Sequence, residues 1–314
     1  MHPAATMTSG GYDSQMRAWS SARFTMPLPE GHRFPIAKYA LVRDTVIRRG
    51  LLPPEAIEEP DAATAETVSL AHTADYVATV LNGTVAPEAT RRLGFPWSPE
   101  LRERSLRTVQ GTLEAARDAL SNGAGINLAG GTHHAFADRG EGFCVFNDVA
   151  VAIRVLRQEG LLGRVAIVDL DVHQGNGTAR IFAGDESVFT FSLHGEKNYP
   201  FHKEVSRLDV GLPDGCDDAA YLAALERHLG PALDAAAADL VCYLAGADPY
   251  RHDRFGRLGL SLAGLCERDR MVFAACRARG LPVVMTLAGG YAHDLADVAA
   301  IHANTVAELL ACLG

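Results

Sequence analysis

Short apolar runs alternate with longer amphipathic stretches from about residue 120 to the end of the chain. The apolar runs are rich in Val, Ile and Leu, and the stretches between or after them carry apolar residues at helical spacing. Short buried strands separated by helices are typical of a parallel sheet with helices on both faces. The pattern predicts strands at 125–129, 164–170, 187–193, 240–246 and 281–287, and helices near 146–158, 217–236, 262–279 and 294–312.

The first third of the chain is predicted to be mainly helical. Helices are expected at 37–49, 73–81 and 99–120, and glycine and proline residues mark the ends of the first two. A loop rich in Gly, Pro and Arg is expected at Pro87–Ser98. The long helix that follows is charged, and we expect a solvated face made of Arg102, Glu103, Arg104 and Arg107.

No internal repeat or low-complexity linker divides the chain. Folds that alternate strands and helices often reach this length as one unit. We therefore expect a single α/β domain over residues 21–314. A polar, irregular segment over residues 1–20 is expected to precede it, with a loose extreme end.

The composition narrows the classes of function. The chain has 314 residues, 48% hydrophobic and 21% charged, as is ordinary for a globular enzyme. A chain of this length buries a large core without help from a structural metal, so a bound metal is expected to be catalytic. The formal net charge of −9 argues against nucleic acid, whose phosphates need clustered Lys and Arg, and is compatible with a cationic substrate.

Cysteine usage and hydropathy indicate the cellular compartment in which we expect the protein. None of the six cysteines forms a Cys-x-x-Cys pair, so we expect buried free thiols in a reducing environment. Met1–Ser21 lacks the basic-then-apolar pattern of a secretory signal, and no apolar run approaches the roughly 20 residues of a membrane span. We expect a cytoplasmic protein with no membrane partner, either a monomer or a small homo-oligomer.

Polar residues follow all five predicted strands. In parallel sheets, ligands bind outside the carboxyl ends of the strands, so these residues are expected to share one rim. They are Gly130-Gly131-Thr132-His133-His134, Asp169-Leu170-Asp171-Val172-His173, Ser192-Leu193-His194, Gly246-Ala247-Asp248 and Gly289-Gly290-Tyr291.

The spacing Asp-x-Asp-x-His suggests a metal site. Alternate side chains of an extended chain share a face, so Asp169, Asp171 and His173 can point into one pocket. Aspartate oxygen and histidine nitrogen suit Zn²⁺, and a distant residue such as Asp248 can complete three ligands and leave a position for water. The alternative is a pair of strand-end carboxylates that cap the next helix.

Two adjacent histidines after Gly-Gly suggest proton transfer. Histidine titrates near neutral pH without large perturbation, which suits a general acid or base. Asp169 is the candidate to orient one imidazole and Asn176 the other. Because Asn carries no charge, its imidazole partner should be less strongly held in the protonated form. Tyr291, beside two glycines, could donate a hydrogen bond to a developing oxyanion, although a lone tyrosine more often serves packing.

Five segments together resemble the zinc-dependent histone deacetylases of the arginase–deacetylase superfamily. The order and spacing match, and the resemblance covers nearly the whole chain from about residue 20. It implies the arginase–deacetylase fold. D-V-H-Q-G-N-G and D-R-G-E-G-F-C look most like class IV deacetylases and their bacterial relatives, and G-H-R-F-P-I-A-K-Y (31–39) looks like the bacterial members. The five segments are G-G-T-H-H-A (130–135), G-F-C-V-F-N-D (142–148), V-D-L-D-V-H-Q-G-N-G-T (168–178), L-A-G-A-D (244–248) and G-G-Y (289–291).

The resemblance assigns roles to the polar residues. Asp171, His173 and Asp248 match the zinc ligands, with ferrous iron as an alternative metal. His133 and His134 match the tandem histidines, of which His134 is expected to be the general base and acid. The remaining matches are Asp169 as partner of His133, Asn176 in the position that is Asp in class I and Asn in classes II and IV, and Tyr291 as the tyrosine that polarises the scissile carbonyl.

The resemblance also implies a substrate tunnel and a potassium site. Phe143, with Gly142 and Gly289, matches one side of an acyl-lysine tunnel, and the opposite wall is expected from either Tyr199 or Phe201. Backbone carbonyls and one side chain match the family's structural K⁺ site: Asp169, Asp171, His173, Leu193 and Ser192. One departure concerns residues 91–99, R-R-L-G-F-P-W-S-P, which lack the acidic residue that clamps the substrate backbone in class I members.

The sequence leaves several functions open. The leading expectation is a metal-dependent hydrolase that removes acetyl or longer acyl groups from lysine in a protein or peptide. An acetylpolyamine amidohydrolase is the alternative among enzymes, and an inactive acyl-lysine binding or scaffold protein is the alternative of another class. An arginase-like di-manganese hydrolase is disfavoured, because His133 and His134 stand where a second metal would need carboxylates.

Overall fold

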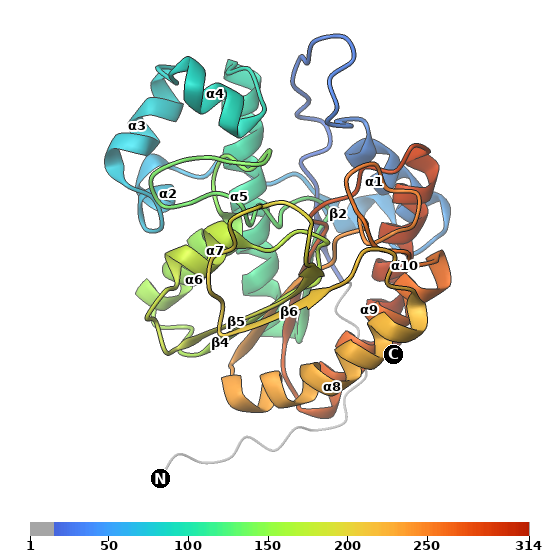
Figure 1. Ribbon diagram of the computed structural model, residues 1–314. Helices are drawn as coiled ribbons and strands as arrows, with labels where there is room; N and C mark the ends of the chain where they lie inside the picture. The colour runs from blue at the N-terminus through green and yellow to red at the C-terminus, as the bar shows by residue number, and fades with distance from the viewer. Residues whose placement is uncertain (1–15, 314) are drawn as a thin grey trace.

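The structure is a computed structural model that describes residues 16–313 (Figure 1). One eight-stranded sheet has the order β2-β1-β3-β8-β7-β4-β5-β6, and every neighbouring pair is parallel. The five predicted strands form its centre, which confirms the predicted fold class. They are β3 (Ala124–Asn127), β4 (Val165–Asp169), β5 (Val188–Gly195), β7 (Leu240–Leu244) and β8 (Val283–Thr286).

The sequence pattern did not predict three of the strands. Strands β1 (Ala18–Trp19) and β2 (Ile57–Glu58) are two residues long, too short for any periodicity. Strand β6 (Leu208–Leu212) closes the other edge and alternates between exposed and partly buried residues. Residues 1–15 of the segment expected to be irregular lie outside the described residues, whereas β1 shows that its end is ordered by pairing with β3.

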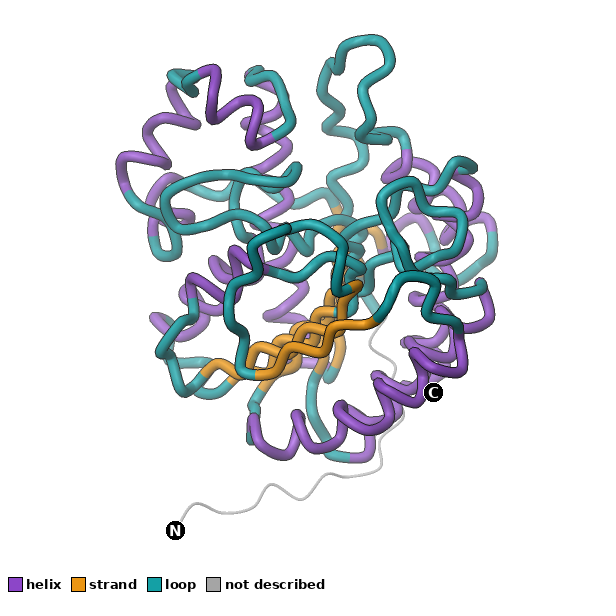
Figure 2. Tube along the Cα trace, in the orientation of Figure 1, coloured by secondary structure: helices purple, strands orange, loops and turns teal. Residues whose placement is uncertain are grey.

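Helices cover both faces of the sheet (Figure 2). Helices α1, α8, α9 and α10 pack against one another on one side, and α5 packs with α6 on the other. Seven predicted helices are confirmed to within a few residues. They are α1 (Lys38–Arg48), α3 (Ala74–Asn82), α5 (Pro99–Asn122), α6 (Asp148–Gln158), α8 (Asp218–Ala236), α9 (Leu262–Ala278) and α10 (Leu295–Leu313).

Four short helical segments were not predicted, and one of them corrects the expected loop at 87–98. Pro87–Leu93 forms helix α4, which begins with proline at its first turn and ends at Gly94 in the left-handed region. The other three are η1 (Pro54–Ala56), α2 (Ala65–Ser69) and α7 (Asn176–Ile181). Helices this short carry too few apolar positions to be recognised by spacing.

The expected solvated face of α5 is wrong for its central arginine. Arg104 is buried, donates to the carbonyl oxygens of Ser21 and Phe24, and stacks 4.1 Å from the centroid of the Tyr39 ring. Arg107 pairs with Glu103 and also reaches a backbone carbonyl. The local charge pattern does not predict the burial of Arg104, because the carbonyl oxygens that it contacts come from a segment far away in the sequence.

Helix α10 corrects the expectation that no apolar run is long enough to span a membrane. Its 19 residues have a mean hydropathy of 1.3, enough by length and composition. It packs between α1 and α9 in this structure, and Val298, Ile301 and Val306 are buried. A core helix of this kind passes the same compositional test as a membrane span.

Candidate active site

Five loops meet at one end of the sheet and bring the predicted residues together. Strands β3, β8, β7, β4 and β5 are neighbours in that order, so the loops that follow them are neighbours too. Each strand is short and fully or almost fully buried, and the chain turns polar where the strand ends. The parallel sheet thus explains why residues distant in sequence share one pocket.

Asp171, His173 and Asp248 form a cluster that fits a metal ion. One ligand atom from each lies within 4.8 Å of the others. Nδ1 of His173 lies 2.9 Å from Asp171 Oδ1 and 3.3 Å from Asp248 Oδ2. Asp248 Oδ2 is buried and faces His173 Nδ1 without forming a well-aligned hydrogen bond to it, a costly arrangement that a bound cation would relieve. Three protein ligands of this kind are typical of catalytic zinc.

The electrostatics of the cluster also favour a cation. Burial by itself would lower the pKa of His173, but hydrogen bonds and charges from Asp171 and Asp248 raise it to about 10. Burial, followed by the charge of Asp171, raises the pKa of Asp248 to about 7. Asp171 and Asp248 therefore repel each other while both face His173, and a cation bound between them would relieve that repulsion.

Gly289 lies directly against the cluster. Its N–H donates to Asp171 Oδ2 at 2.7 Å. A Cβ built on Gly289 would lie 1.8 Å from Asp248 Oδ2, so only glycine fits beside the carboxylates. Gly289 thus borders the cluster of Asp171, His173 and Asp248, and the pocket that opens onto this cluster is lined by other residues.

The two adjacent histidines have different surroundings. Nδ1 of His133 lies 2.6 Å from Asp169 Oδ2, and Nδ1 of His134 lies 2.7 Å from Asn176 Oδ1. Burial would lower the pKa of His133, but the charges of Asp169 and Asp171 raise it to about 9. Burial and the neighbouring charge of His133 hold the pKa of His134 well below 6.5. His133 is therefore set to be cationic and His134 to be neutral, in line with the charged and uncharged partners.

Glu141 orients the Asn176 side chain that contacts His134, and the sequence did not indicate this role. Its Oε1 accepts a hydrogen bond from Asn176 Nδ2 at 3.3 Å and another from the Tyr199 hydroxyl. An amide whose nitrogen faces Glu141 must turn its oxygen toward His134, so Nδ1 of His134 carries the proton. Nε2 is then the free acceptor. The only signal in the sequence was that Glu141 precedes the G-F-C motif.

Tyr291 is held by groups on two other segments of the chain. Its N–H donates to Asp253 Oδ2 at 2.6 Å, and its carbonyl accepts from Arg254 Nε at 2.7 Å. Lys38 is fully buried, donates to the carbonyls of Ala288 and Gly290, and lies 5.0 Å from the centroid of the Tyr291 ring. Burial, together with Asp171 and Asp248, raises the pKa of Tyr291 well above 10, so its hydroxyl remains a donor.

A pocket of about 670 Å³ opens onto this centre. His134, His173 and Tyr291 lie among its lining residues, with Phe143 and Gly142 on one side. The ring of Tyr199 lies 5.0 Å from that of His134 and 6.4 Å from that of His173, so it lines the inner part of the pocket. Phe201 is 82% exposed and lies at the mouth. The structure thereby separates two residues that the sequence left as alternatives.

Residues 32–308 match the profile of the histone deacetylase domain. The chain belongs to the histone deacetylase family. An uncharacterised protein of Picosynechococcus sp. is 45% identical over 89% of this chain and 93% of its own length. Histone deacetylase 2 of Arabidopsis thaliana is 31% identical over 88% of this chain and 73% of its own. The chain is therefore an amide hydrolase of the histone deacetylase family.

Solved structures agree on the fold. The HDA15 HD domain superposes with a TM-score of 0.79 at 23% identity, and the match covers 95% of this chain and 88% of the other. An acetylpolyamine aminohydrolase from Burkholderia pseudomallei gives 0.78 at 22% identity, over 94% and 98% of the two chains. The arginase–deacetylase architecture is thus confirmed.

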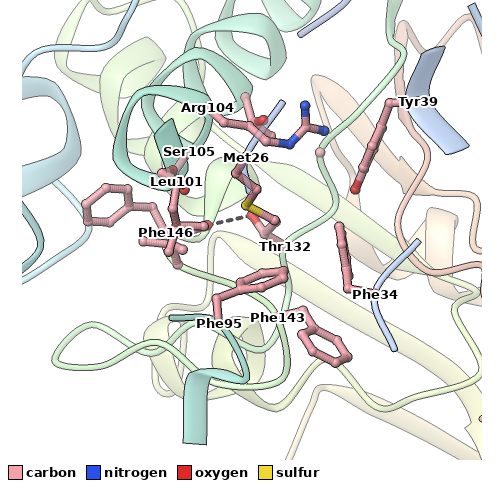
Figure 3. Close-up of a pocket in the computed structure, with 13 residues that line it drawn as sticks. Met26, Phe34, Tyr39, Phe95, Leu101, Arg104, Ser105, Thr132, Phe143 and Phe146 are labelled. Atoms are coloured by element: carbon pink, nitrogen blue, oxygen red, sulfur yellow. Dashed lines mark hydrogen bonds between the residues drawn. The ribbon is translucent and has the colours of Figure 1, made fainter. Parts of the chain in front are cut away.

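A second, smaller pocket lies behind the tunnel wall of this deacetylase-family chain. Figure 3 shows Phe143 at its edge, with Phe34, Phe95 and Met26 around it. The room inside is about 40 Å³, compared with about 670 Å³ in the larger pocket. Phe143 also lines the larger pocket, so its ring separates the two spaces.

The position of Phe143 depends on helix α4. Phe143 has a φ of +67°, in the left-handed region, and its N–H donates to the carbonyl of Leu93 at 2.8 Å. A Cβ on Gly94 would lie 2.7 Å from the Phe143 ring, so the glycine that ends α4 also makes room for the tunnel wall. The segment that was expected to be a loop therefore fixes the tunnel.

The predicted potassium site lies where β4 and β5 pair. Asp169 is in register with Ser192, and Leu193 follows on the same strand. The Ser192 hydroxyl lies 2.9 Å from Nδ1 of His194, a partner that the sequence did not suggest. The pairing brings the two segments together, and K⁺ binding stays a prediction.

Proposed function

We propose that the chain is a zinc-dependent lysine deacylase, which hydrolyses acyl groups from the Nε amine of lysine. The observation that carries the proposal is the buried cluster of Asp171, His173 and Asp248, in which Asp248 Oδ2 has no well-aligned hydrogen bond, beside a pocket lined by His134 and Tyr291. This combination supplies a cation site, a neutral base and a hydrogen-bond donor. We propose the same roles for Asp169 and Asn176 as the sequence suggested, and zinc rather than ferrous iron as the metal.

The residues of the chain can carry the proton through the reaction. Zinc bound by Asp171, His173 and Asp248 would supply Lewis acidity toward the amide carbonyl and its attacking water. His134 is neutral and uses Nδ1 to bond Asn176, so Nε2 accepts the proton of the water that attacks the carbonyl carbon. The Tyr291 hydroxyl donates to the developing oxyanion. His134 then protonates the leaving amine as the C–N bond breaks, which yields a free carboxylic acid and lysine.

His133 contributes charge rather than proton transfer. It is paired with Asp169, and the pKa near 9 keeps it cationic at neutral pH. Its ring centroid lies 4.1 Å from that of His134, and this charge helps to hold the neighbouring imidazole neutral. We infer that the pair works as one unit, in which a fixed cation prevents His134 from resting in the protonated form.

The tunnel suits an unbranched aliphatic amine. Phe143 and Tyr199 present aromatic rings on opposite sides, which can pack along the methylene chain of lysine. Behind Phe143, room of about 40 Å³ accepts no long chain unless side chains move. We therefore propose acetyl as the preferred acyl group, with octanoyl and myristoyl poorer.

An acetylpolyamine amidohydrolase remains the second candidate, because the Burkholderia pseudomallei acetylpolyamine aminohydrolase shares the fold over 94% of this chain. A scaffold protein without activity is disfavoured, since the cation site, the base and the donor are all present. We further propose a cytoplasmic location and a structural K⁺, in keeping with the sequence.

The test is turnover on lysine peptides that carry acetyl, butyryl, octanoyl or myristoyl groups, and on acetylspermidine. Zinc content is measured alongside for the native protein and for Asp248→Ala. We expect turnover of acetyl-lysine by the native protein, and loss of both zinc and turnover in the variant. No turnover on any substrate would support the scaffold alternative, and a variant as active as the native protein would overturn the metal site.

A further inference from the structure

Six basic side chains line the pocket that leads to the catalytic centre. No aspartate or glutamate is among the described residues that line it. The six come from four separate parts of the chain, and all are exposed. They are Arg33, Arg91, Arg92, Lys197, Arg254 and Arg257, which we call the basic rim.

Most of the basic rim has no acidic partner. Arg91 pairs with Glu88 and Arg257 with Asp214. Over residues 16–313, the other four rim side chains make no ion pair with a carboxylate. Arg254 instead donates to two backbone carbonyls, of Tyr291 and Arg33, so its charge is fixed at the mouth without being neutralised.

Asp253 and Glu141, two acidic side chains near the mouth, are engaged in hydrogen bonds. Asp253 accepts hydrogen bonds from the backbone N–H groups of Phe255, Gly256 and Tyr291. Glu141 lies behind Tyr199, where it accepts from the hydroxyl. The chain as a whole carries a net charge of −9, so this concentration of positive charge is opposite in sign to the average. A substrate that enters meets the local field and not the net charge.

We propose that the basic rim binds carboxylates next to the acylated amine, so that the enzyme prefers acyl-lysine flanked by aspartate or glutamate in a peptide or protein. This inference rests on the proposed deacylase function and adds the sequence context of its substrate. Arginine is well suited to the role, because its planar guanidinium matches the two oxygens of a carboxylate. Acylated polyamines, which are cationic, are repelled by the same charges.

The expected size of the preference for acidic flanking residues follows from the solvent exposure of the rim side chains. An exposed ion pair changes binding by about 1.4- to 5-fold, and several charges in one rim act together. We expect acidic flanks to exceed basic flanks by roughly tenfold in kcat/KM. Because the rim is open to solvent, the preference should shrink as salt shortens the Debye length from about 10 Å at 0.1 M to about 3 Å at 1 M.

The experiment uses one acetyl-lysine in three peptides, flanked on both sides by Glu, Ala or Arg, at low and high salt. Turnover is measured together with the Kd of the corresponding deacetylated peptides by fluorescence anisotropy, which needs no chemistry. Free Nε-acetyllysine and its C-terminal amide test whether an α-carboxylate is recognised instead. Acetylspermidine completes the set, and we expect it to be the poorest substrate.

Charge-reversal variants test whether the basic rim causes the preference for acidic flanking residues. Arg92→Glu combined with Lys197→Glu removes two unpaired rim charges, and we expect the Glu-to-Arg preference to fall about tenfold. Arg227→Glu is the control, because Arg227 is exposed on α8 and does not line the pocket. It should leave the preference unchanged.

Each outcome separates the two proposals. If no peptide is turned over, the proposed function fails. If all three peptides are turned over and bound equally, the function stands and the basic rim has no role. If the control variant shifts the preference as much as the rim variant, the effect is one of net charge. A larger gain from the free carboxylate of acetyllysine than from acidic flanks would overturn recognition of flanking side chains.

Discussion

The floor and the rim of the pocket differ in the burial of their side chains and in how those side chains are held in place. At the floor, Asp171 and Asp248 are almost fully buried and their positions are fixed by strand ends and backbone N–H groups. At the rim, Arg92 and Lys197 are exposed and project from a short helix and a loop. In the proposed reaction the floor carries the chemistry, whereas the rim meets the parts of the substrate that do not react.

The difference decides how much each residue can contribute. Buried groups act in a medium of low effective dielectric, so the loss of one partner is costly. Exposed charges are screened and each contributes little. Substitutions at the floor should therefore change turnover by orders of magnitude, and those at the rim should change selectivity by small factors.

The largest effect among single-atom changes is expected at Tyr291. Tyr291→Phe removes the hydroxyl that we propose donates to the oxyanion but keeps the ring among Phe34, Phe143 and Phe255. Loss of one oxyanion donor costs about 10²- to 10³-fold in kcat. We expect a decrease of that size with zinc content unchanged, measured by steady-state kinetics and metal analysis. Activity close to that of the native protein would remove Tyr291 from the reaction.

A smaller effect is expected at Glu141, which links the floor to the wall. Glu141→Gln keeps the shape but replaces a charged acceptor of the Asn176 and Tyr199 hydrogen bonds by a neutral one. Hydrogen bonds to charged groups are worth about 1 kcal/mol more than neutral ones, so we expect kcat to fall roughly fivefold. Because Glu141 orients Asn176 rather than touching substrate, KM should stay nearly constant.

The matched control is Glu226→Gln, an exposed carboxylate on α8 outside the pocket. It should leave kcat as it is. A Glu141→Gln variant that raises KM with kcat unchanged would mean that Glu141 shapes the wall only. Equal kcat and KM in both variants would show that Asn176 keeps its orientation without the charge.

The sequence predicts the floor well because the floor is local. Asp169, Asp171 and His173 lie on five consecutive positions, and the five strand-end loops are forced together by parallel pairing. The central strands were recognised for the same reason, since each is a continuous buried run. Strand β1 was missed because two residues are too few for a pattern, and β6 because its five residues alternate instead of forming the continuous apolar run that marks the central strands.

The rim and the supports of the floor could not be predicted, because their partners are far apart in the sequence. Lys38 reaches the carbonyls beside Tyr291 from a separation of about 250 residues, and the segment 31–39 that contains it does not indicate that the lysine is buried. Arg104 was expected to be solvated for the same reason. Net charge was also misleading, since a total of −9 does not indicate a pocket lined by six basic side chains.

The smallest effect is expected at Phe201, where the aromatic wall becomes the rim. Phe201 is 82% exposed, and its ring centroid lies 6.4 Å from that of Tyr199, so Phe201→Ala removes little buried area. We expect KM to rise about two- to threefold with kcat unchanged, because an exposed apolar contact contributes well under 1 kcal/mol. Tyr199→Ala is the comparison, since that ring contacts His134 and should lower kcat as well. Similar losses of kcat in the two variants would contradict the division of the pocket into a catalytic floor and a selective rim.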